Sequence, residues 1–517
     1  MTVNNDVSHH EVLVIGAGFG GINAGVQLRK AGIEDFVILD KWHQVGGTWN
    51  ANRYPGVAVD IPSFIYQFSY QQKGSWSRLF AEGGEIQKYA EEVVTRQGLR
   101  SKLRLETAVE RMRFDEATDL WHVETDKGEY TARFVIGGIG GLEVPNLPDI
   151  AGIDTFGGKV IHTSRWDHDY DLTGKRVAVI GTGATALQVI PTIAEQVSHL
   201  TVFQRTPIWV GPKPDWDTGP VTKAVLGNPL TRWPLRAVGM VGTELGIGGA
   251  LVAGPAAIPA LRGVETAIKL WMRTQVKDKD LRDKLTPDYL FACKRPSISN
   301  SYLRTFEQPH VDLITDPIEK ITPDAVVTQD GTEHPIDVLI CATGFKVMEK
   351  GATPPFPTLG RGGVDLNNWW DENRYQAYQG VSVPGFPNFF MVIGPYAYSP
   401  GSYLVLIEAT GRHAVRVICE ARRRRATRAE IKQEPHERYW KQMLRRVGRT
   451  PIVGPLCAGS NTYYLNYQGD GAAYRPSTGL EMRLHNRFFP LDNYQYSLAR
   501  AKFADSIDSE HELAVAK

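Results

Sequence analysis

The chain has 517 residues, enough for two or three domains with large buried cores. Hydrophobic residues make up 42% and charged residues 22%, an ordinary balance for a globular protein. The formal net charge of +1 argues against a nucleic acid or an acidic partner recruited by bulk attraction.

Cysteine spacing and the N-terminus limit the class of protein further. The four cysteines, Cys293, Cys341, Cys419 and Cys457, form no C-x-x-C pair. This argues against a metal site, a secreted disulfide framework and a redox-active dithiol. The polar residues before Glu11 lack the apolar core of a signal peptide, so we expect a cytoplasmic protein.

A strand, a glycine-rich turn and a helix are predicted near the N-terminus. Residues 11–15 form a short, mostly apolar run rich in β-branched side chains, as in a buried parallel strand. A G-x-G-x-x-G turn follows at Gly16–Gly21, then a helix over 22–31. The next strand, 36–39, ends at Asp40, at the spacing where a ribose hydroxyl acceptor is expected. This context predicts a dinucleotide site and is far more specific than the turn alone.

Each glycine of the turn has its own task in such a site. Gly16 allows the tight turn, Gly18 lets the backbone reach the pyrophosphate, and Gly21 lets helix and strand pack closely. The helix N-terminus then faces the phosphates.

The next segment combines glycines with aromatic residues. Gly46-Gly47-Thr48-Trp49 is followed by Tyr54-Pro55-Gly56, and the segment closes at Asp60. The glycines allow close backbone approach, and Trp49 and Tyr54 offer flat apolar faces. Ordinary core packing is the alternative for these two aromatic side chains.

A second fingerprint follows in mid-chain. Strand 176–180 leads into Gly181-Thr182-Gly183-Ala184-Thr185-Ala186, the G-x-G-x-x-A variant, and a helix predicted through Val197. Strand 200–203 ends in Gln204-Arg205-Thr206, with no acid at that point. An arginine there suits the 2′-phosphate of NADP, with an ordinary surface arginine as the alternative.

Two further segments carry unusual residue patterns. Between the fingerprints, Phe156, Gly158, His162, Trp166 and Asp167 follow the spacing F-x-G-x-x-x-H-x-x-x-W-D. Downstream, Cys293-Lys294-Arg295 places two adjacent cations between the nucleotide-binding halves. A solvated basic pair is the alternative for these cations.

Taken together, these motifs resemble the Baeyer–Villiger monooxygenases, a family of FAD- and NADPH-dependent class B flavoprotein monooxygenases. The resemblance rests on G-G-x-W…Y-P-G…D at 46–60, the 156–167 signature and the C-K-R stretch at 293–295, and it covers most of residues 10–495. The related N- and S-oxygenating enzymes usually have Tyr or Phe in place of Trp166 and lack the acid at Asp167.

The resemblance implies a flavin-dependent monooxygenase that uses NADPH, O2 and a C4a-peroxyflavin to insert oxygen next to a ketone carbonyl, giving an ester or lactone. It makes Arg295 the catalytic cation, paired with Asp60, which faces the flavin. The implied FAD site comprises Gly16, Gly18, Phe19, Gly21, Asp40, Lys41, Gly47, Thr48, Trp49, Asp60, Tyr66 and Val109. The implied NADP site comprises Gly181, Thr182, Gly183, Ala184, Thr185, Ala186, Arg205, Thr206 and Lys294.

The expected fold is α/β, with two Rossmann-like domains. We predict FAD-domain parts at 1–147 and 345–517 around an NADP domain at 148–344, which carries a helical insertion at about 213–285. Residues 237–261 of the insertion are apolar but contain the helix breakers Pro255 and Pro259. We expect this stretch to pack against the body or line a substrate entrance; a weak membrane-surface contact is the alternative.

Several alternatives stay open. The stretch 461–470 lacks the tryptophan-bearing Gly-Ala-Asn sequence of better-known members, so the ketone is not specified. His162 is expected to couple the domains rather than to transfer protons. A heteroatom (S or N) oxygenase is the main alternative function; an NADPH-dependent flavoprotein reductase or a nucleotide-sensing module ranks lower. We expect no metal and no nucleic-acid partner, and the oligomeric state is open.

Overall fold

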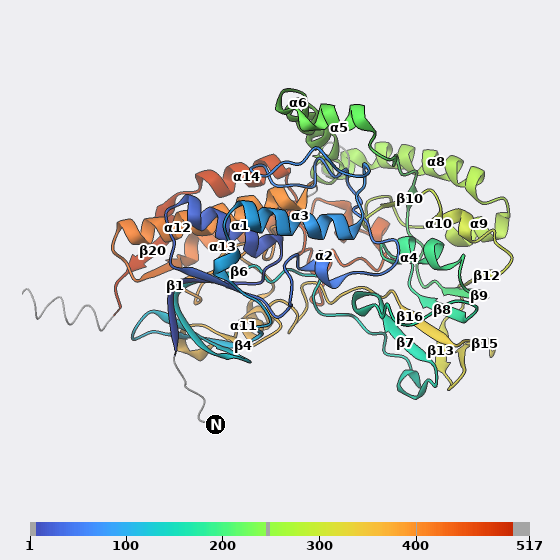
Figure 1. Cartoon of the computed structure of the whole chain (residues 1–517), viewed down its shortest axis with the longest axis horizontal. Coiled ribbons are helices and arrows are strands. Elements are labelled where there is room, and N and C mark those ends of the chain that lie inside the picture. Colours follow the sequence, from blue (N-terminus) through green and yellow to red (C-terminus); the bar gives the residue numbers. More distant parts are fainter. Residues whose placement is uncertain (1–6, 245–248, 400, 500–517) are drawn as a thin grey trace, which may run out of the picture.

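A computed structural model of the chain describes residues 7–244, 249–399 and 401–499. Two sheets with helices packed on them form two neighbouring lobes, one at the left and one at the right of Figure 1. The fold is therefore α/β with two Rossmann-like units, as predicted.

The first sheet takes strands from both ends of the chain. Its order is β17-β4-β5-β6-β1-β2-β3, and β18 also pairs with β6. The strands are parallel except for the β4–β5–β6 meander. Their bounds are β1 Ser8–Ile15, β2 Phe36–Leu39, β3 Leu103–Arg104, β4 Val109–Asp115, β5 Leu120–Thr125, β6 Gly128–Gly137, β17 Thr358–Leu359 and β18 Phe389–Met391.

The second sheet is parallel throughout, with the order β12-β9-β8-β16-β7. Its strands are β7 Lys159–His162, β8 Arg176–Ile180, β9 His199–Phe203, β12 Val311–Ile314 and β16 Val338–Cys341. Three small sheets complete the strands: β10 Val210–Gly211 with β11 Ser297–Ile298; β13 Ile318–Ile321, β14 Ala325–Thr328 and β15 Glu333–Pro335; and β19 Arg428–Ile431 with β20 Tyr494–Ser497.

Helices cover both sheets. Within the first lobe, α1 packs on the long, mostly buried α12, and the Asn23 amide of α1 donates to the Ile407 carbonyl of α12 at 3.0 Å. The α-helices are α1 Phe19–Lys30, α2 Thr48–Ala51, α3 Gly83–Arg96, α4 Ala186–Ile193, α5 Pro220–Gly227, α6 Pro229–Thr243, α7 Gly249–Ala253, α8 Ile258–Gln275, α9 Lys279–Leu285, α10 Tyr302–Thr305, α11 Leu366–Asn373, α12 Tyr403–Arg423, α13 Gln433–Val447 and α14 Gly479–Phe488. The helix predicted to continue through Val197 ends earlier, as α4.

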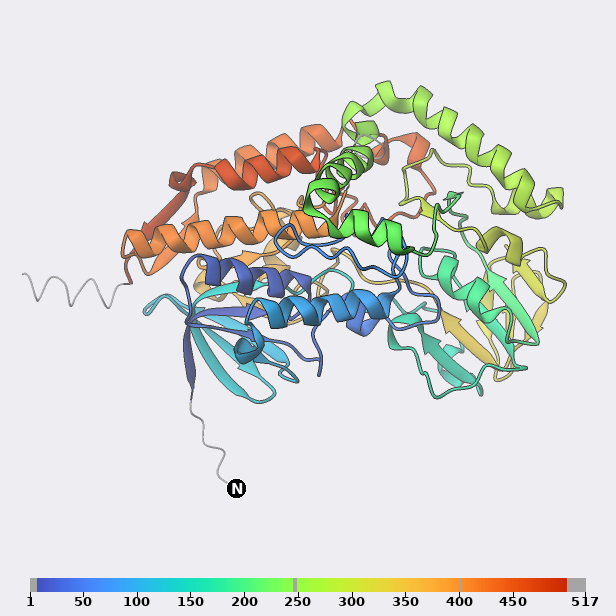
Figure 2. The ribbon, with the colours of Figure 1, turned by 45° about the horizontal axis from the view of Figure 1, so that its top comes forward.

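The insertion is helical, as predicted, and contains α5 to α9. It leaves the second lobe after β10 and returns at β11, while α5, α6 and α8 lie along the upper edge of the molecule in Figure 1. Figure 2 shows the same helices standing outside the two sheets. None of the helices in the described part of the chain is long and apolar enough to cross a membrane.

Candidate functional site

The first glycine turn joins β1 to α1 in a conformation that requires glycine. Gly16 has φ +94°, and a Cβ on Gly21 would lie 1.7 Å from the Gly16 carbonyl oxygen. Gly18 caps α1, and no side chain caps the helix there. The first amides of α1 therefore remain available for a phosphate.

Asp40 stands at the end of β2, beside that turn. Its carboxylate accepts hydrogen bonds from the amides of Ala17 at 2.5 Å and Trp42 at 2.8 Å. The residue is only 8% exposed, and burial raises the pKa of its carboxyl group. Because each oxygen accepts a single amide, one lone pair on each remains for a ribose hydroxyl.

Two other residues expected in the flavin site lie near Asp40. Lys41 forms an ion pair with Glu143. Val109 begins β4, two residues after Thr107, whose amide donates to the Asp40 carbonyl at 2.8 Å. Lys41 follows Asp40 directly, and Val109 is held near it by this backbone hydrogen bond.

The 46–60 segment packs against the same turn. Gly47 has φ +54°, and a Cβ there would lie 2.8 Å from the Cα of Gly18. Thr48 begins α2, and the indole Nε1 of Trp49 donates to the Tyr66 hydroxyl at 3.0 Å. The side chain of Phe19 is buried in the core, so only its backbone is placed to contact a phosphate.

The second glycine turn repeats the arrangement between β8 and α4. Gly181 has φ +114°, and a Cβ there would lie 2.5 Å from the Ala342 carbonyl oxygen. A Cβ on Gly183 would meet nothing within 4 Å, so this side of the turn is open. Thr185 caps α4 without a side-chain hydrogen bond, after the exposed Ala184, and the helix begins at the buried Ala186.

Two cations lie beside the second turn. Neither Arg205 nor Lys294 forms a salt bridge within the described residues. Burial and the charge of Arg205 both lower the pKa of the Lys294 ammonium, so the two cations lie close together. Neighbouring Thr206 accepts a hydrogen bond from Asn461 at 2.8 Å, and its carbonyl accepts one from Thr182 at 2.8 Å. Two close cations without carboxylates suit a phosphate group.

The two nucleotide units contact each other directly. The Tyr54 hydroxyl donates to Gln188 of α4 at 2.9 Å, and the Gln188 amide donates to the Ala58 carbonyl at 3.0 Å. Gly56 lies so close to α4 that a Cβ would be 2.6 Å from the Gln188 carbonyl oxygen. The flavin-side segment thus rests on the helix of the second fingerprint.

Arg295 is held at this junction by two partners from the first lobe. Its Nε and Nη2 donate to the same Asp60 oxygen at 2.9 and 2.6 Å, and Nη1 donates to the Tyr398 hydroxyl at 2.7 Å. The Asp60 carboxylate, followed by Tyr398, holds the pKa of Arg295 well above its usual value. The expected Arg295–Asp60 pair is present, and Tyr398 completes a three-residue cluster in which the guanidinium stays protonated.

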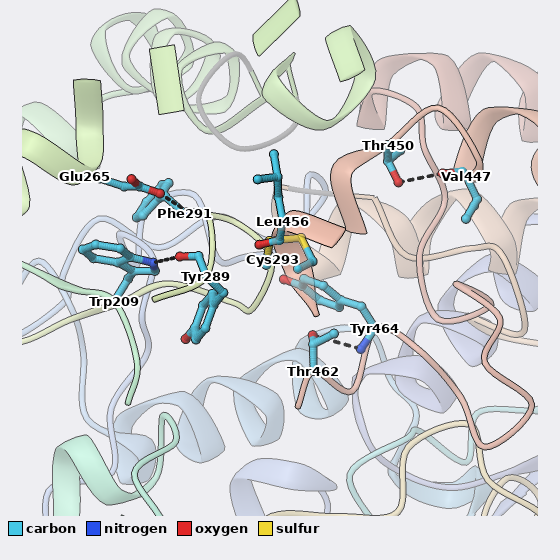
Figure 3. The surroundings of a disulfide bond; sticks show 11 residues. Trp209, Glu265, Tyr289, Phe291, Cys293, Val447, Thr450, Leu456, Thr462 and Tyr464 are labelled. Carbon is cyan, nitrogen blue, oxygen red and sulfur yellow. Dashed lines mark hydrogen bonds between the residues drawn. A yellow bond between two sulfur atoms is a disulfide. The ribbon is translucent and has the colours of Figure 1, made fainter. Parts of the chain in front are cut away.

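Hydrogen bonds from several elements hold the loop that carries Lys294 and Arg295 (Figure 3). Trp209 Nε1 donates to the Tyr289 carbonyl at 3.0 Å, and the Phe291 amide donates to Glu265 of α8 at 2.8 Å. The Leu290 amide donates to the Leu456 carbonyl at 3.0 Å. These bonds fix the loop from both the insertion and the C-terminal segment.

A disulfide also fixes this loop. It corrects the expectation of no disulfide that was drawn from cysteine spacing. Cys293, next to Lys294, is bonded to Cys457, 164 residues away in sequence (Figure 3). Cys341 and Cys419 are free. Spacing along the chain carried no signal because the fold, not local sequence, brings the two sulfur atoms together.

The 156–167 signature lies at the start of the second lobe. Phe156 is buried, and a Cβ on Gly158 would lie 2.3 Å from the Asp337 carbonyl oxygen. His162 ends β7 with Nδ1 2.8 Å from the Ser164 hydroxyl, and burial lowers its pKa. Trp166 packs against the core of the second lobe, and Asp167 pairs with Lys159 at 2.7 Å. Arg295 forms its hydrogen bonds with Asp60 and Tyr398 and none with these side chains.

The residues present fit both nucleotide cofactors. Each glycine turn leads into a helix whose first amides have no side-chain cap, as a pyrophosphate requires. The acid Asp40 suits a ribose hydroxyl, and the cations Arg205 and Lys294 suit a phosphate. FAD therefore fits the first unit and NADP the second. Within the described residues, no group of three potential ligands could hold a metal ion.

Comparison with known proteins identifies the family. The family model described as pyridine nucleotide-disulphide oxidoreductase matches residues 13–230. A Baeyer–Villiger monooxygenase of Streptomyces coelicolor is 37% identical over 494 residues, covering 94% of this chain and 92% of the relative. The chain belongs to the Baeyer–Villiger monooxygenase family. A second member, from Pseudomonas aeruginosa, is 36% identical and covers 89% of this chain and 86% of the relative.

Solved structures agree with this assignment. The closed crystal structure of cyclohexanone monooxygenase superposes with a TM-score of 0.83 at 29% identity, covering 95% of this chain and all of that one. The NADP+-bound cyclohexanone monooxygenase of Rhodococcus sp. Phi1 also has a TM-score of 0.83 at 29% identity, covering 96% of this chain and 100% of that one. The protein is thus an NADPH-dependent flavoprotein monooxygenase that uses FAD.

Sequence reasoning missed the residues that complete the site from a distance. Tyr398, Asn461 and Cys457 follow the second fingerprint by more than 200 residues, and none of them was predicted as a site residue. Glu265 lies within an amphipathic helix, where a single acid is an ordinary surface residue by pattern. Only the folded chain shows that these residues contact Arg295, Thr206, Cys293 and Phe291.

Proposed function

We propose that this monooxygenase inserts one oxygen atom next to a ketone carbonyl and releases an ester or lactone. The observation that carries the proposal is Arg295, a cation from the second lobe held by Asp60 and Tyr398 of the first. FAD, when bound, supplies hydride acceptance from NADPH and the activation of oxygen.

In this proposal, the charge of Arg295 stabilises negative charge that develops during the oxygen chemistry. Asp60 and Tyr398 fix the guanidinium, so little reorganisation is needed when the charge appears. Arg205 and Lys294 bind the 2′-phosphate of NADP, and Thr206 supports that site through its bonds to Thr182 and Asn461.

The assignment of residues to the two cofactors is likewise a proposal. Gly16, Gly18 and Gly21 would bring the backbone to the FAD pyrophosphate, and the 181–186 turn would do the same for NADP. We also propose FAD-domain parts at 1–147 and 345–517 and an NADP domain at 148–344, because the strands of each sheet fall within these limits.

Oxygenation of nitrogen or sulfur is the second candidate function. A phenazine N-monooxygenase of Lysobacter antibioticus is 34% identical over 432 residues, covering 76% of this chain. Against it as the main reaction stands the 156–167 signature, in which both Trp166 and Asp167 are present.

Product analysis separates the two reactions. The purified protein is supplied with NADPH and air, together with a panel of ketones, thioethers and aromatic nitrogen heterocycles. We expect esters or lactones to dominate. Exclusive formation of sulfoxides or N-oxides would replace the proposal with the alternative. NADPH consumption without any oxygenated product across a broad panel would argue for a reductase.

The insertion also bears on the partners of the enzyme. Part of the 237–261 stretch, residues 245–248, lies outside the described residues. Of the described apolar residues, Leu261 and Ala257 pack inward, whereas Val238 and Val241 are exposed. This division supports a membrane-surface contact in addition to packing on the body.

A further inference from the structure

The helix α6 carries its apolar stripe toward the outside of the protein. Leu230 is 84% exposed, Trp233 71%, Val238 71% and Val241 54%. Their spacing of three, five and three residues places them on one face of the helix. A surface helix normally buries such a stripe, so the exposed face needs a partner.

Packing on the opposite face fixes this orientation. Arg236 is 5% exposed, and its guanidinium donates to the Gln67 carbonyl of the first lobe at 2.7 Å. Gly239 lies against Ile65, where a Cβ would be 2.6 Å from the nearest side-chain atom. Rotating α6 to bury its apolar stripe would break both contacts.

Neighbouring helices extend the exposed apolar surface. Val221 of α5 is 78% exposed, and Leu270 of α8 is 56% exposed. Figure 1 shows α5, α6 and α8 along one edge of the molecule. We call Val221, Leu230, Trp233, Val238 and Val241 the outer face.

The charges around the outer face have one sign. Between Asp217 and Asp278 the sequence has only two acids, Glu244 and Glu265. Glu265 is buried and bonded to the Phe291 amide, and Glu244 is half-buried beside the Leu480 amide. The exposed charged side chains of α5 and α8 are cations: Arg262 is paired with Glu265 at 2.8 Å, whereas Lys223, Lys269 and Arg273 have no carboxylate partner within the described residues.

We propose that the outer face binds the surface of an anionic lipid bilayer, with Leu230 and Trp233 inserted among the acyl chains. Apolar side chains with a tryptophan, bordered by cations, are the features of helices that lie in a membrane interface. The cations then face lipid phosphates, to which each contributes attraction within about one Debye length.

A second copy of the chain fits this surface less well. A two-fold dimer places the same patch of each subunit against the other. The cations of both copies would then face each other, and the two acids of the stretch are turned inward. A fluid bilayer also accommodates projecting side chains without a complementary surface.

Membrane binding would take place close to the active site. The Ile65 side chain under α6 precedes Tyr66, which bonds to Trp49 of the flavin-side segment. Glu265 of α8 holds the loop that carries Arg295. On the proposed function, apolar ketones dissolved in the bilayer would therefore reach the site directly; the binding itself does not depend on that function.

Co-sedimentation of the full-length, FAD-loaded protein with vesicles tests the proposal. One set of vesicles contains phosphatidylcholine alone and the other adds phosphatidylglycerol. The test variant is Leu230→Ser/Trp233→Ser. The matched control, Leu147→Ser/Val364→Ser, changes two exposed apolar residues elsewhere, which are 60% and 44% exposed. Flavin content and circular dichroism verify that both variants fold.

We expect the wild type and the control to bind anionic vesicles, and the test variant to bind at least about tenfold more weakly. Adding Lys223→Glu should weaken binding further. Wild-type protein that stays in the supernatant, or a test variant that binds as well as wild type, overturns the proposal. So does a wild-type dimer in sedimentation velocity that the test variant converts to monomer, since the face would then be a protein interface. Vesicle binding needs no substrate, so its failure is distinct from failure of the proposed reaction.

Discussion

The two nucleotide units share a strand, a glycine turn and a helix, yet opposite charges stand at the end of the next strand. In the first unit Asp40 is buried and accepts two backbone amides. In the second, Arg205 is exposed and has no carboxylate partner within the described residues. The first unit therefore holds its acid in a fixed, buried position, whereas the second presents an exposed cation.

The two glycine turns also differ, in how closely the helix approaches the strand. Gly21 lies so close to the Gly16 carbonyl that no side chain fits, whereas the matching position in the second turn is Ala186. The helix of the first unit therefore packs more tightly on its strand than that of the second. The same strand–turn–helix arrangement therefore provides two nucleotide units that differ in packing and in charge.

The strongest way to break the first unit is Gly21→Ala. A Cβ placed 1.7 Å from the Gly16 oxygen forces the backbone apart, so we expect complete loss of bound flavin. The flavin spectrum and protein-bound FAD after gel filtration measure this. Its matched control is Ala186→Gly in the second turn, which should retain FAD. A yellow Gly21→Ala protein with normal flavin content would refute the packing argument.

Arg295→Ala should disable the cluster that joins the two units. Hydride transfer places little new negative charge near Arg295, but the oxygen chemistry does, so we expect flavin reduction to persist. Loss of a preorganised donor of this kind costs about 10²–10³-fold in product formation. The electrons should appear as hydrogen peroxide.

Anaerobic stopped-flow reduction, then mixing with oxygen and product analysis, separates the two half-reactions. Asp60→Ala is the companion variant and should slow both, because it disturbs the guanidinium and the flavin side together. Near wild-type ester yield from Arg295→Ala would mean that another cation carries the charge.

Arg205→Ala should affect only the second unit. Losing one charged contact to the 2′-phosphate, worth about 1.5–3 kcal/mol, should raise the NADPH requirement roughly tenfold to hundredfold. NADH has no such phosphate, so its use should hardly change. Steady-state kinetics with both cofactors measure the ratio; equal losses would make Arg205 structural.

Tyr398→Phe removes the hydroxyl that accepts a hydrogen bond from Arg295 and keeps the aromatic ring. A hydrogen bond to a charged group contributes about 1.5 kcal/mol or more, so we expect roughly tenfold more hydrogen peroxide per NADPH. The rate of anaerobic reduction should stay the same. Tyr467→Phe, which removes a hydroxyl bonded to Asp371 away from Arg295, is the control. Unchanged coupling in Tyr398→Phe would show that Asp60 alone positions the guanidinium.

The pH dependence should also distinguish the units. The pKa of Lys294 is lowered by burial and by Arg205, so Lys294 loses its charge at a lower pH than an ordinary lysine. Affinity for NADPH, which needs the charged form, is full below that pKa and should fall as the pH rises through it. NADH binding should vary less over the same range. Lys294→Arg keeps its charge, so binding titrations of this variant should show no fall in NADPH affinity over the same pH range.

Sequence alone determined the local features of both units. A positive φ at Gly16 and Gly181 and the close approach at Gly21 belong to the turns themselves, so the motifs predicted strand, turn and helix. The acid at Asp40 and the cation at Arg205 follow their strands directly, so the spacing predicted a nucleotide for each unit.

Tertiary structure decided what the chain brings together over long distances. Arg295 meets Tyr398, and Cys293 meets Cys457, only after the C-terminal segment folds back onto the second lobe. The orientation of α6 is similar: the apolar residues of this helix share one face, but their spacing does not say whether that face is covered. Arg236 and Gly239 pack on the first lobe, so the apolar face of α6 points outward. The surroundings of a helix, and not its own residues alone, determine which face is buried.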